Sequence, residues 1–453
     1  MIVVDSVILA AGGGTRMKSK TPKVLHNACG APIIDWVIES ADVVSENIIV
    51  VIGHESAQVR GHLESNKRGG KLKYAEQKQL LGTGHAVMQA RDVITADTTL
   101  IIAGDVPLIT GETLKNALEF HKKSQAEITI ITANFKKPFG YGRIVRDSSG
   151  NIVKIVEEKD ANAEQRAISE VNSGVYFFNT EFLKSLEGKI SRSNAQGEFY
   201  LTDSIEIAVS EGKKAAAFLL KDSREMLGVN SREQLAKVEK LLRGRIIKNH
   251  MENGVTFIDT RSSYIGKNVK IGQDTIIYPQ TAIEGSSVIG EDCVIRGSRI
   301  SDSVIGNGAQ VENSLVISSK IGEKTVIGPF AYVRPNCVIG DGNRIGDFVE
   351  LKNSNIGNGT KISHLTYVGD ADVGENVNFG CGSVVVNYDG KKKTRSEVQD
   401  GAFIGCNVNL ISPVVVEKDA FIAAGSTITK NVPSKGLAIA RPRQENKENW
   451  VKE

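Results

Sequence analysis

The first half of the chain alternates short apolar runs with segments in which apolar residues recur at the spacing of a helix. The apolar runs predict strands at Ile2 to Leu9, Ile48 to Ile52, Thr99 to Ala103 and Ile128 to Thr132. Helices are predicted between them, at Pro32 to Val44 and Gly84 to Val93. This alternation is typical of βαβ units, so we expect an α/β domain with a mostly parallel sheet that binds its ligands at the carboxyl ends of the strands.

From Ile265 onward, an aliphatic residue, often followed by glycine, recurs every six positions. The repeat includes Ile265, Ile271, Ile321, Ile327, Val333, Ile339, Ile345 and Leu351 and, after a slip of one residue at Ile356, continues at Ile362 and Val368. One inward aliphatic residue per six predicts a parallel β-helix, in which three repeats make one coil. The alternative is a passive scaffold or a trimerisation stalk, because a solenoid needs no activity to justify its repeats.

The charged segment between the two halves has leucine and valine at helical spacing, which predicts a connecting helix whose basic face is solvated. We therefore expect an α/β domain over residues 1–230, the helix over 231–249, the β-helix over 250–437 and a C-terminal tail over 438–453.

Composition narrows the function classes. The chain has 453 residues, which favours two or more domains, and its net charge of +3 comes from scattered residues, which favours a small-molecule substrate over nucleic acid. Five cysteines without a CxxC pair argue against a zinc site or a disulfide framework and favour a reducing compartment. No apolar stretch approaches the roughly 18 residues of a membrane span, and the N-terminal apolar run contains Asp5. We therefore expect a strand there rather than a signal peptide, and a cytoplasmic protein.

The stretch LAAGGGTRMKSKTPK, residues 9–23, combines three glycines with cationic residues, among them Arg16 and Lys23. Backbone N–H groups of Gly12 to Thr15 can bind phosphate oxygens, and the cations supply the charge that a triphosphate requires. The stretch lacks the third glycine of the dinucleotide fingerprint and the G-K-[ST] of a Walker loop, which disfavours a dehydrogenase. The alternative to a phosphate cradle is a tight turn into a helix.

Two further loops follow predicted strands or begin predicted helices. Asp105 in GDVPL can hold a magnesium ion against phosphate oxygens, and its alternative is an Asx turn before Pro107. Gly82 and Thr83 in QLLGTGHA fit either a base-binding pocket or an N-cap at Thr83.

One histidine, His364, follows His250, which excludes a three-histidine zinc site in the β-helix. A lone imidazole suits acid–base chemistry or, as the alternative, core packing. Charged and aromatic residues interrupt the repeats around His364, which favours catalysis.

A series of short motifs is distributed along nearly the whole chain. In the first half they are, in order, LAAGGGTRM, LGTGHA, GDVPL, GYGRIV, IVEEKDA, VNSGVY and GVNSREQL, and in the second half FVELKNS, KISHLTYVGD and NVNFGCGSVVVNYDG. They resemble the bacterial bifunctional N-acetylglucosamine-1-phosphate uridyltransferase/glucosamine-1-phosphate acetyltransferases. The resemblance implies a Rossmann-like nucleotidyltransferase domain followed by a left-handed parallel β-helix. It further implies the co-substrates UTP and acetyl-CoA, a requirement for Mg²⁺, a cytoplasmic homotrimer without nucleic-acid or membrane partners, and a product that feeds peptidoglycan and other cell-envelope polymers.

In the first half, the resemblance assigns UTP or UDP-sugar contacts to Leu9, Ala11, Gly12, Arg16, Lys23, Gln77, Gly82, Thr83, Gly140, Glu157, Asn172 and Asn230. Among these, Gly140, Glu157 and Asn172 match positions that contact the amino sugar, and Asp105 and Asn230 match metal ligands. In-line attack of a sugar phosphate on the α-phosphorus needs positioning and charge neutralisation but no covalent protein intermediate.

In the second half, the resemblance makes His364 the general base and Glu350 the residue that orients its ring. It assigns the sugar phosphate to Arg334, Lys352, Tyr367, Asn378, Asn387 and Tyr388. It assigns acetyl-CoA to Cys381, Asn387, Tyr388, Cys406, Ala424 and Arg441, where Cys381 and Cys406 stand in place of the alanine and serine typical of relatives.

These inferences predict an enzyme that acetylates glucosamine 1-phosphate in its β-helix and couples the product to UTP in its first domain. The alternative is a single-activity sugar-1-phosphate nucleotidyltransferase whose β-helix is structural or regulatory.

Overall fold

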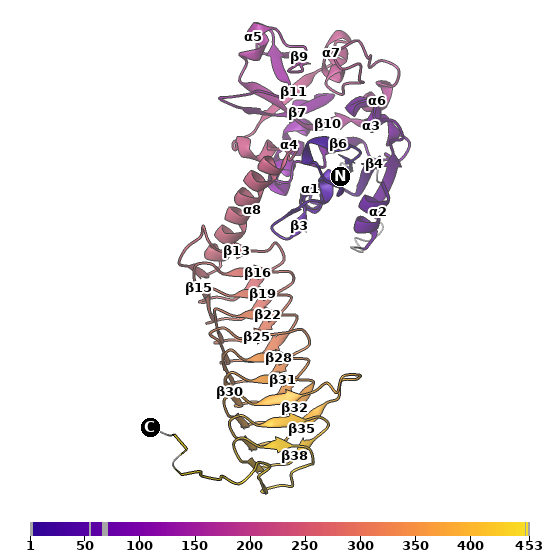
Figure 1. The fold of residues 1–453 in the computed structure, drawn as a ribbon. Helices are drawn as coiled ribbons and strands as arrows, with labels where there is room; N and C mark the ends of the chain where they lie inside the picture. The colour runs from indigo at the N-terminus through magenta and orange to yellow at the C-terminus, as the bar shows by residue number, and fades with distance from the viewer. Residues whose placement is uncertain (1–2, 54–55, 66–70, 449, 452–453) are drawn as a thin grey trace. The chain divides into compact units, whose positions relative to one another are not determined.

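The computed structural model describes residues 3–53, 56–65, 71–448 and 450–451, and it divides into two compact units, Met1–Leu242 and Arg243–Glu453 (Figure 1). Among the described residues, no helix combines the length and the apolar character needed to cross a membrane.

The first unit is built on a nine-stranded sheet whose main path runs in the order β11-β7-β10-β6-β1-β4-β5. Its strands are β1 (Val4–Leu9), β4 (Asn47–Ile52), β5 (Leu72–Glu76), β6 (Thr98–Ala103), β7 (Ile128–Asn134), β8 (Arg143–Arg146), β9 (Ile152–Val156), β10 (Glu170–Asn179) and β11 (Ala215–Leu219). Strands β6, β1, β4 and β5 are parallel, β11 is parallel to β7, and β10 runs antiparallel to both β6 and β7. The mostly parallel sheet is thus confirmed, and only Ile2 of the predicted strands lies outside the described residues.

Alternate residues of the central strands enter two separate hydrophobic cores. Ile8 and Val50 belong to the core that includes α1 (Ile33–Asp42) and α4 (Gly111–Ser124). Val7 belongs to the core that includes α3 (Thr83–Gln89), α6 (Thr180–Ser185) and α7 (Asp203–Ser210). Because both faces of the sheet are buried, its central strands are mostly apolar in the sequence and do not alternate with exposed polar residues.

The two predicted helices correspond to α1 and α3, and α3 ends at Gln89, before the predicted end at Val93. The remaining helices of the first unit are α2 (Ser56–Ser65) and the short α5 (Ala163–Arg166). The predicted connecting helix is α8 (Arg232–Glu252), and its residue Ile247 packs into the hydrophobic core of the second unit.

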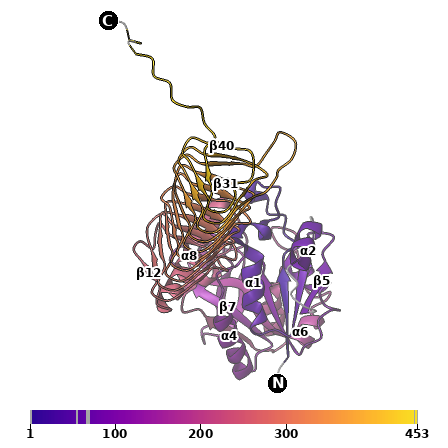
Figure 2. The same ribbon diagram turned by 90° about the horizontal axis from the view of Figure 1, so that it is seen from below.

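The second unit is a left-handed parallel β-helix made of three parallel sheets with 11, 10 and 9 strands (Figure 2). Its strands run from β12 (Thr256–Phe257) to β41 (Leu437–Ala438), and consecutive strands mostly enter consecutive sheets. Inward aliphatic residues pair in register from coil to coil and form stacked columns, one of which contains Ile277, Ile295, Val311, Ile327, Ile345 and Ile362. The six-residue period therefore predicted the fold correctly.

The slip of the period at Ile356 has a simple cause. Ile356 pairs with Ile339, and the spacing between them is one residue less than that between Ile339 and its preceding partner Ile321. The coil is shorter by one residue, but its aliphatic side chain still enters the core, where it is 3% exposed.

Candidate functional site

The loop after β1 packs closely against other residues at two positions where one of the two partners is glycine. Gly14 has a φ of 54°, and a Cβ there would lie 2.7 Å from the Cβ of Lys23. A Cβ on Gly53 would lie 2.9 Å from that of Ala11. Gly12 and Gly13 border open space instead. Glycine thus brings the loop against Lys23 while the middle of the loop stays accessible to a ligand.

This loop borders a cavity of about 300 Å³ at the carboxyl ends of β1 and β6. The cavity is lined by most of the predicted nucleotide and metal residues, namely Leu9, Ala11, Gly12, Lys23, Gln77, Gly82, Thr83 and Asp105. Arg16 is exposed and does not line it. Parallel neighbouring strands end at the same edge of a sheet, which is why segments so far apart in sequence meet here.

Three polar side chains meet at one end of the cavity. The ammonium of Lys23 contacts Asp105 Oδ2 and lies 3.0 Å from Asn230 Oδ1. The backbone N–H of Val229 donates to the Asp105 carbonyl at 2.8 Å, which fixes the segment that carries Asn230. A carboxylate and an amide oxygen that both face one cation are a donor set that suits Mg²⁺, which prefers hard oxygen ligands and leaves further positions for phosphate.

At the other end of the cavity, the side chain of Gln77 is buried. Its Nε2 lies 3.1 Å from the carbonyl oxygen of Gly82 and 3.0 Å from Nδ1 of His85. Gly82 has a φ of 111°, and a Cβ there would lie 2.6 Å from the carbonyl oxygen of Phe199, so only glycine fits. Gly82 is also the N-cap residue of α3, so the alternative that Thr83 caps this helix is wrong.

The predicted sugar-binding residues lie partly together. Glu157 accepts from the Thr202 hydroxyl at 3.3 Å, and burial raises the pKa of its carboxyl group. Asn172 donates its backbone N–H to the carbonyl oxygen of Gly142 at 2.9 Å, and a Cβ on Gly142 would lie 3.3 Å from Glu157 Oε1. Gly142 therefore links these two residues.

Gly140 has a different environment from Glu157 and Asn172. Its backbone N–H donates to Glu158 at 3.1 Å, and its own position is exposed. The contacts of the described residues thus do not bring Gly140 together with Glu157 and Asn172, and its role in sugar binding stays a prediction.

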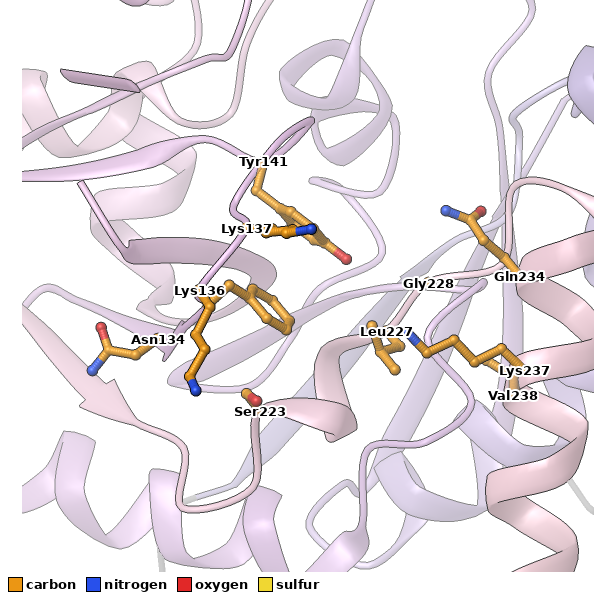
Figure 3. A pocket seen from close by; sticks show the side chains of 11 residues that line it. Asn134, Lys136, Lys137, Tyr141, Ser223, Leu227, Gly228, Gln234, Lys237 and Val238 are labelled. Carbon is orange, nitrogen blue, oxygen red and sulfur yellow. The ribbon is translucent and has the colours of Figure 1, made fainter. Parts of the chain in front are cut away.

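A second, larger cavity of about 640 Å³ is lined by residues of the segment after β7, of the segment before α8 and of α8 itself (Figure 3). Lys136 and Lys237 extend toward it from opposite sides, one from the segment after β7 and the other from α8. Gly228 forms part of its wall, and a Cβ there would lie 3.7 Å from Asn230 Nδ2. Tyr141 also lines it, and burial together with the negative charge of Asp105 raises the pKa of its phenol. The lysines give this cavity a positive potential that favours anions.

In the second unit, His364 ends strand β30 (Lys361–His364), and its register partner on β27 (Arg344–Asp347) is Asp347. The His364 Nδ1 lies 2.6 Å from Asp347 Oδ1, and the histidine side chain is 55% exposed. The hydrogen bond to His364 is the main cause that lowers the pKa of the Asp347 carboxyl. A proton on Nδ1 is thus held by Asp347, which leaves Nε2 free to accept one.

Glu350, on β28 (Glu350–Lys352), is the register partner of Tyr367 rather than of His364. Its carboxylate forms an ion pair with Arg334 at 2.8 Å. Among the described residues, the side-chain contact of the His364 ring is thus with Asp347, and that of Glu350 is with Arg334, one of the predicted sugar-phosphate residues.

A buried carboxylate, Asp370, connects several of the predicted sugar-phosphate residues. It lies 3.3 Å from the ammonium of Lys352 and accepts from the side chain of Asn387, which in turn lies 3.4 Å from the Tyr367 hydroxyl. Burial opposes ionisation of Asp370, but hydrogen bonds from Asn353, Asn387 and Lys352 lower its pKa overall. The tertiary structure thus joins residues that the sequence analysis had only named separately.

The predicted acetyl-CoA residues lie on successive coils. The backbone N–H of Asn407 donates to the carbonyl oxygen of Cys381, and that of Gly425 donates to Cys406, each at 2.8 Å. Cys381, Cys406 and Ala424 therefore occupy equivalent corners of three coils. Cys406 is exposed and Cys381 half-buried, whereas the other cysteines, Cys29, Cys293 and Cys337, are buried.

Asn378, Tyr388 and Arg441 complete the predicted set of residues in the β-helix. Asn378 lies in β33 (Asn378–Phe379), directly after β30 in its sheet, and is half-buried. Tyr388 is 53% exposed, in the loop between β34 (Val384–Val386) and β35 (Ser396–Val398). Arg441 is exposed, after the last strand.

Comparison with known proteins supports a nucleotidyltransferase fold in the first unit and hexapeptide repeats in the second. A nucleotidyl transferase family matches residues 5–237, and a bacterial transferase hexapeptide family, with six repeats, matches residues 318–353. Proteins named bifunctional protein GlmU from Acetivibrio thermocellus and Caldanaerobacter subterraneus are each 52% identical to this chain. The alignments cover 98% and 99% of this chain and 96% and 97% of the relatives. A protein of the same name from a Geobacillus species is 52% identical over 100% of this chain and 98% of its own length.

Proposed function

The chain belongs to the bifunctional GlmU family, and from this premise we propose that it makes UDP-N-acetylglucosamine in two steps. The β-helix transfers an acetyl group from acetyl-CoA to glucosamine 1-phosphate, and the first unit couples the product to UTP and releases pyrophosphate. The observation that carries this proposal is that each unit holds its own polar cluster, Lys23 with Asp105 and Asn230 in one and His364 with Asp347 in the other.

For uridyl transfer, a phosphate oxygen of N-acetylglucosamine 1-phosphate attacks the α-phosphorus of UTP, and the bond to the β-phosphate oxygen breaks. Lys23 neutralises negative charge on the phosphates, and Gln77 with Gly82 binds the base. Gly140, Glu157 and Asn172 bind the amino sugar on the neighbouring segments. No protein nucleophile takes part, so the role of these residues is to position and to neutralise.

Asp105 and Asn230 would hold the magnesium ion, since their oxygens already face a common cation, Lys23. When bound, the ion supplies positive charge to the triphosphate. With UTP present, the ammonium of Lys23 can shift from Asp105 to the phosphates, so the same two oxygens become available to a metal.

For acetyl transfer, Nε2 of His364 takes a proton from the amino group of glucosamine 1-phosphate while the nitrogen attacks the thioester carbonyl. Asp347 holds the opposite ring nitrogen and stabilises the imidazolium that forms. The carbon–sulfur bond then breaks, and coenzyme A leaves as a thiol after taking up a proton. Lys352 and Arg334 bind the sugar phosphate, each held by a carboxylate.

A homotrimer in the cytoplasm is part of the proposal. Phe330, Phe348 and Leu365 occupy one corner of successive coils and are 57%, 57% and 58% exposed. Phe330 and Phe348 stack with ring centroids 5.6 Å apart. Such a contiguous apolar ladder favours contact with another copy of the chain, and it lies next to His364 and Asp347.

The test of this function is to assay the full chain separately for acetyl transfer to glucosamine 1-phosphate and for uridyl transfer to N-acetylglucosamine 1-phosphate. Both activities are expected. Uridyl transfer without acetyl transfer would support the single-activity alternative, which the bifunctional names of the relatives do not favour.

Asp347→Ala should lower kcat for acetyl transfer about tenfold with little change in KM for glucosamine 1-phosphate, because the His364 ring loses its only described side-chain partner. Asp347→Asn should recover at most a small part of kcat, since its amide oxygen can still accept from Nδ1 but carries no charge to stabilise the imidazolium. Steady-state kinetics of the two variants, with uridyl transfer as the folding control, would check this. An unchanged kcat in Asp347→Ala would contradict the role.

A maleimide should inactivate acetyl transfer and spare uridyl transfer, because Cys406 and Cys381 are the accessible thiols of the described chain and lie on the predicted coenzyme surface. An adduct there would collide with the pantetheine arm. Acetyl-CoA should protect, and the double variant Cys381→Ala/Cys406→Ser should resist. Equal loss of activity in the double variant and the parent would show that other groups are responsible.

A further inference from the structure

The amide of Gln77 is held by two hydrogen-bond acceptors. The carbonyl oxygen of Gly82, 3.1 Å from Gln77 Nε2, can only accept, so the NH₂ end of the amide must face it. The second amide hydrogen points to Nδ1 of His85, 3.0 Å away. Both hydrogens are thereby used, and the carbonyl oxygen Oε1 is directed away from Gly82 and His85.

His85 is itself held in place on α3. Its ring stacks on Phe199 with centroids 6.2 Å apart and an interplanar angle of 25°. Nδ1 must lack a hydrogen to accept from Gln77, so the neutral ring carries its hydrogen on Nε2. The side-chain Nε2 of Gln89 donates to the carbonyl oxygen of His85 at 3.2 Å and lies 3.3 Å from Nε2 of the ring.

Gln77 lines the nucleotide cavity, whereas His85 does not. His85 instead lines a separate cavity of about 260 Å³, together with Met88 and Phe199. Its side-chain contact with a residue of the nucleotide cavity is the one with Gln77.

We propose that His85 is a positioning residue that fixes the carbonyl oxygen of Gln77 toward the base, so that the site selects pyrimidine triphosphates that present a ring N–H, as uracil does. The inference rests on the proposed uridyl transfer. A uracil N3–H would donate to this oxygen, whereas cytosine presents an unprotonated N3, and two acceptors would then face each other in a buried site. A site built around such a hydrogen bond rejects analogues that lack the donor.

Removal of the Nδ1 acceptor leaves the amide with one of its two anchors. The half-turned amide, with NH₂ toward the base, then becomes accessible, and that orientation suits cytosine. Selectivity should therefore fall without disappearing, because Gly82 still favours the original orientation.

The test compares kcat/KM for UTP and for CTP in the full chain with N-acetylglucosamine 1-phosphate. His85→Phe keeps the ring and its stacking on Phe199 but has no acceptor, and the UTP-to-CTP ratio should fall about tenfold. His85→Asn is the matched control, because its side-chain oxygen can take the place of Nδ1, and the ratio should stay near that of the parent. Acetyl transfer should be the same in all three proteins.

If His85 acts through Gln77, His85→Phe should lower selectivity no further in a protein that already carries Gln77→Ala. A parent-like ratio in His85→Phe, or an equal loss in His85→Asn, would overturn the inference. A parent that uses neither triphosphate would instead overturn the proposed function, and this inference with it.

Discussion

Lys23→Ala is expected to lower the rate of uridyl transfer at least a hundredfold and to leave acetyl transfer unchanged. Lys23 is the cation that lines the nucleotide cavity next to the predicted metal ligands. The loss of one preorganised charge that stabilises a transition state costs about 3 kcal/mol, which corresponds to a hundredfold or more. Asp105→Ala should have an effect of the same size, because it removes the carboxylate from the oxygen pair that suits magnesium.

The measurement is release of pyrophosphate from UTP in the presence of N-acetylglucosamine 1-phosphate and magnesium, alongside an acetyl-transfer assay on the same preparations. Lys20→Ala is a matched control, since Lys20 is an exposed lysine of the same segment that does not line the cavity. Full uridyl transfer in both Lys23→Ala and Asp105→Ala would mean that the glycine-rich loop is a turn and not a phosphate cradle.

His364→Ala is expected to abolish acetyl transfer and to leave uridyl transfer to pre-acetylated substrate intact. Nε2 of the histidine takes the proton of the amine in the proposed reaction. Asp347 lies on the opposite side of the ring, at Nδ1, so its carboxylate does not take the place of Nε2 in the variant. The two activities separate because His364 and the nucleotide cavity belong to different compact units.

Release of the coenzyme A thiol measures the first activity, and release of pyrophosphate measures the second. Lys361→Ala, an exposed position at the other end of β30, controls for disturbance of the strand. Normal acetyl transfer in His364→Ala would refute its role as base. Loss of both activities in a folded protein would indicate that His364 is structural.

The fold could be predicted from the sequence because the six-residue period of the β-helix and the apolar runs of the first unit are both patterns within short stretches of chain. Hydrophobic residues at i and i+6 must enter the same core when each repeat adds one flat face, so a list of positions was enough to predict coils. The strands of the first unit could be located for a related reason. Ile8 and Val7 face different cores, so burial on both sides makes the strand largely apolar, with Asp5 and Ser6 as buried polar exceptions.

The nucleotide cavity was partly predictable. Its loops follow parallel strands, and such loops share one edge of the sheet, so Lys23 and Asp105 could be expected to meet. Only the tertiary structure shows the environments of the two glycines of the GYGRIV motif: a Cβ on Gly142 would lie 3.3 Å from Glu157 Oε1, whereas Gly140 is exposed.

Residue types and periodicity thus predicted the two fold classes, which the structure confirms, and pointed to the candidate base and the candidate phosphate loop, because each depends on a short stretch of chain. The partners of those residues depend on the register between coils and on loops that converge from distant segments. Asp347 faces His364, and Glu350 faces Tyr367, because the coils between them are of a particular length. Asp370 contacts both Lys352 and Asn387 for the same reason. A shift of one residue in one coil would change each of these pairs between coils, but the six-residue hydrophobic period would still be recognisable in the sequence. The partners of the site residues are therefore determined by the folded register and not by the composition.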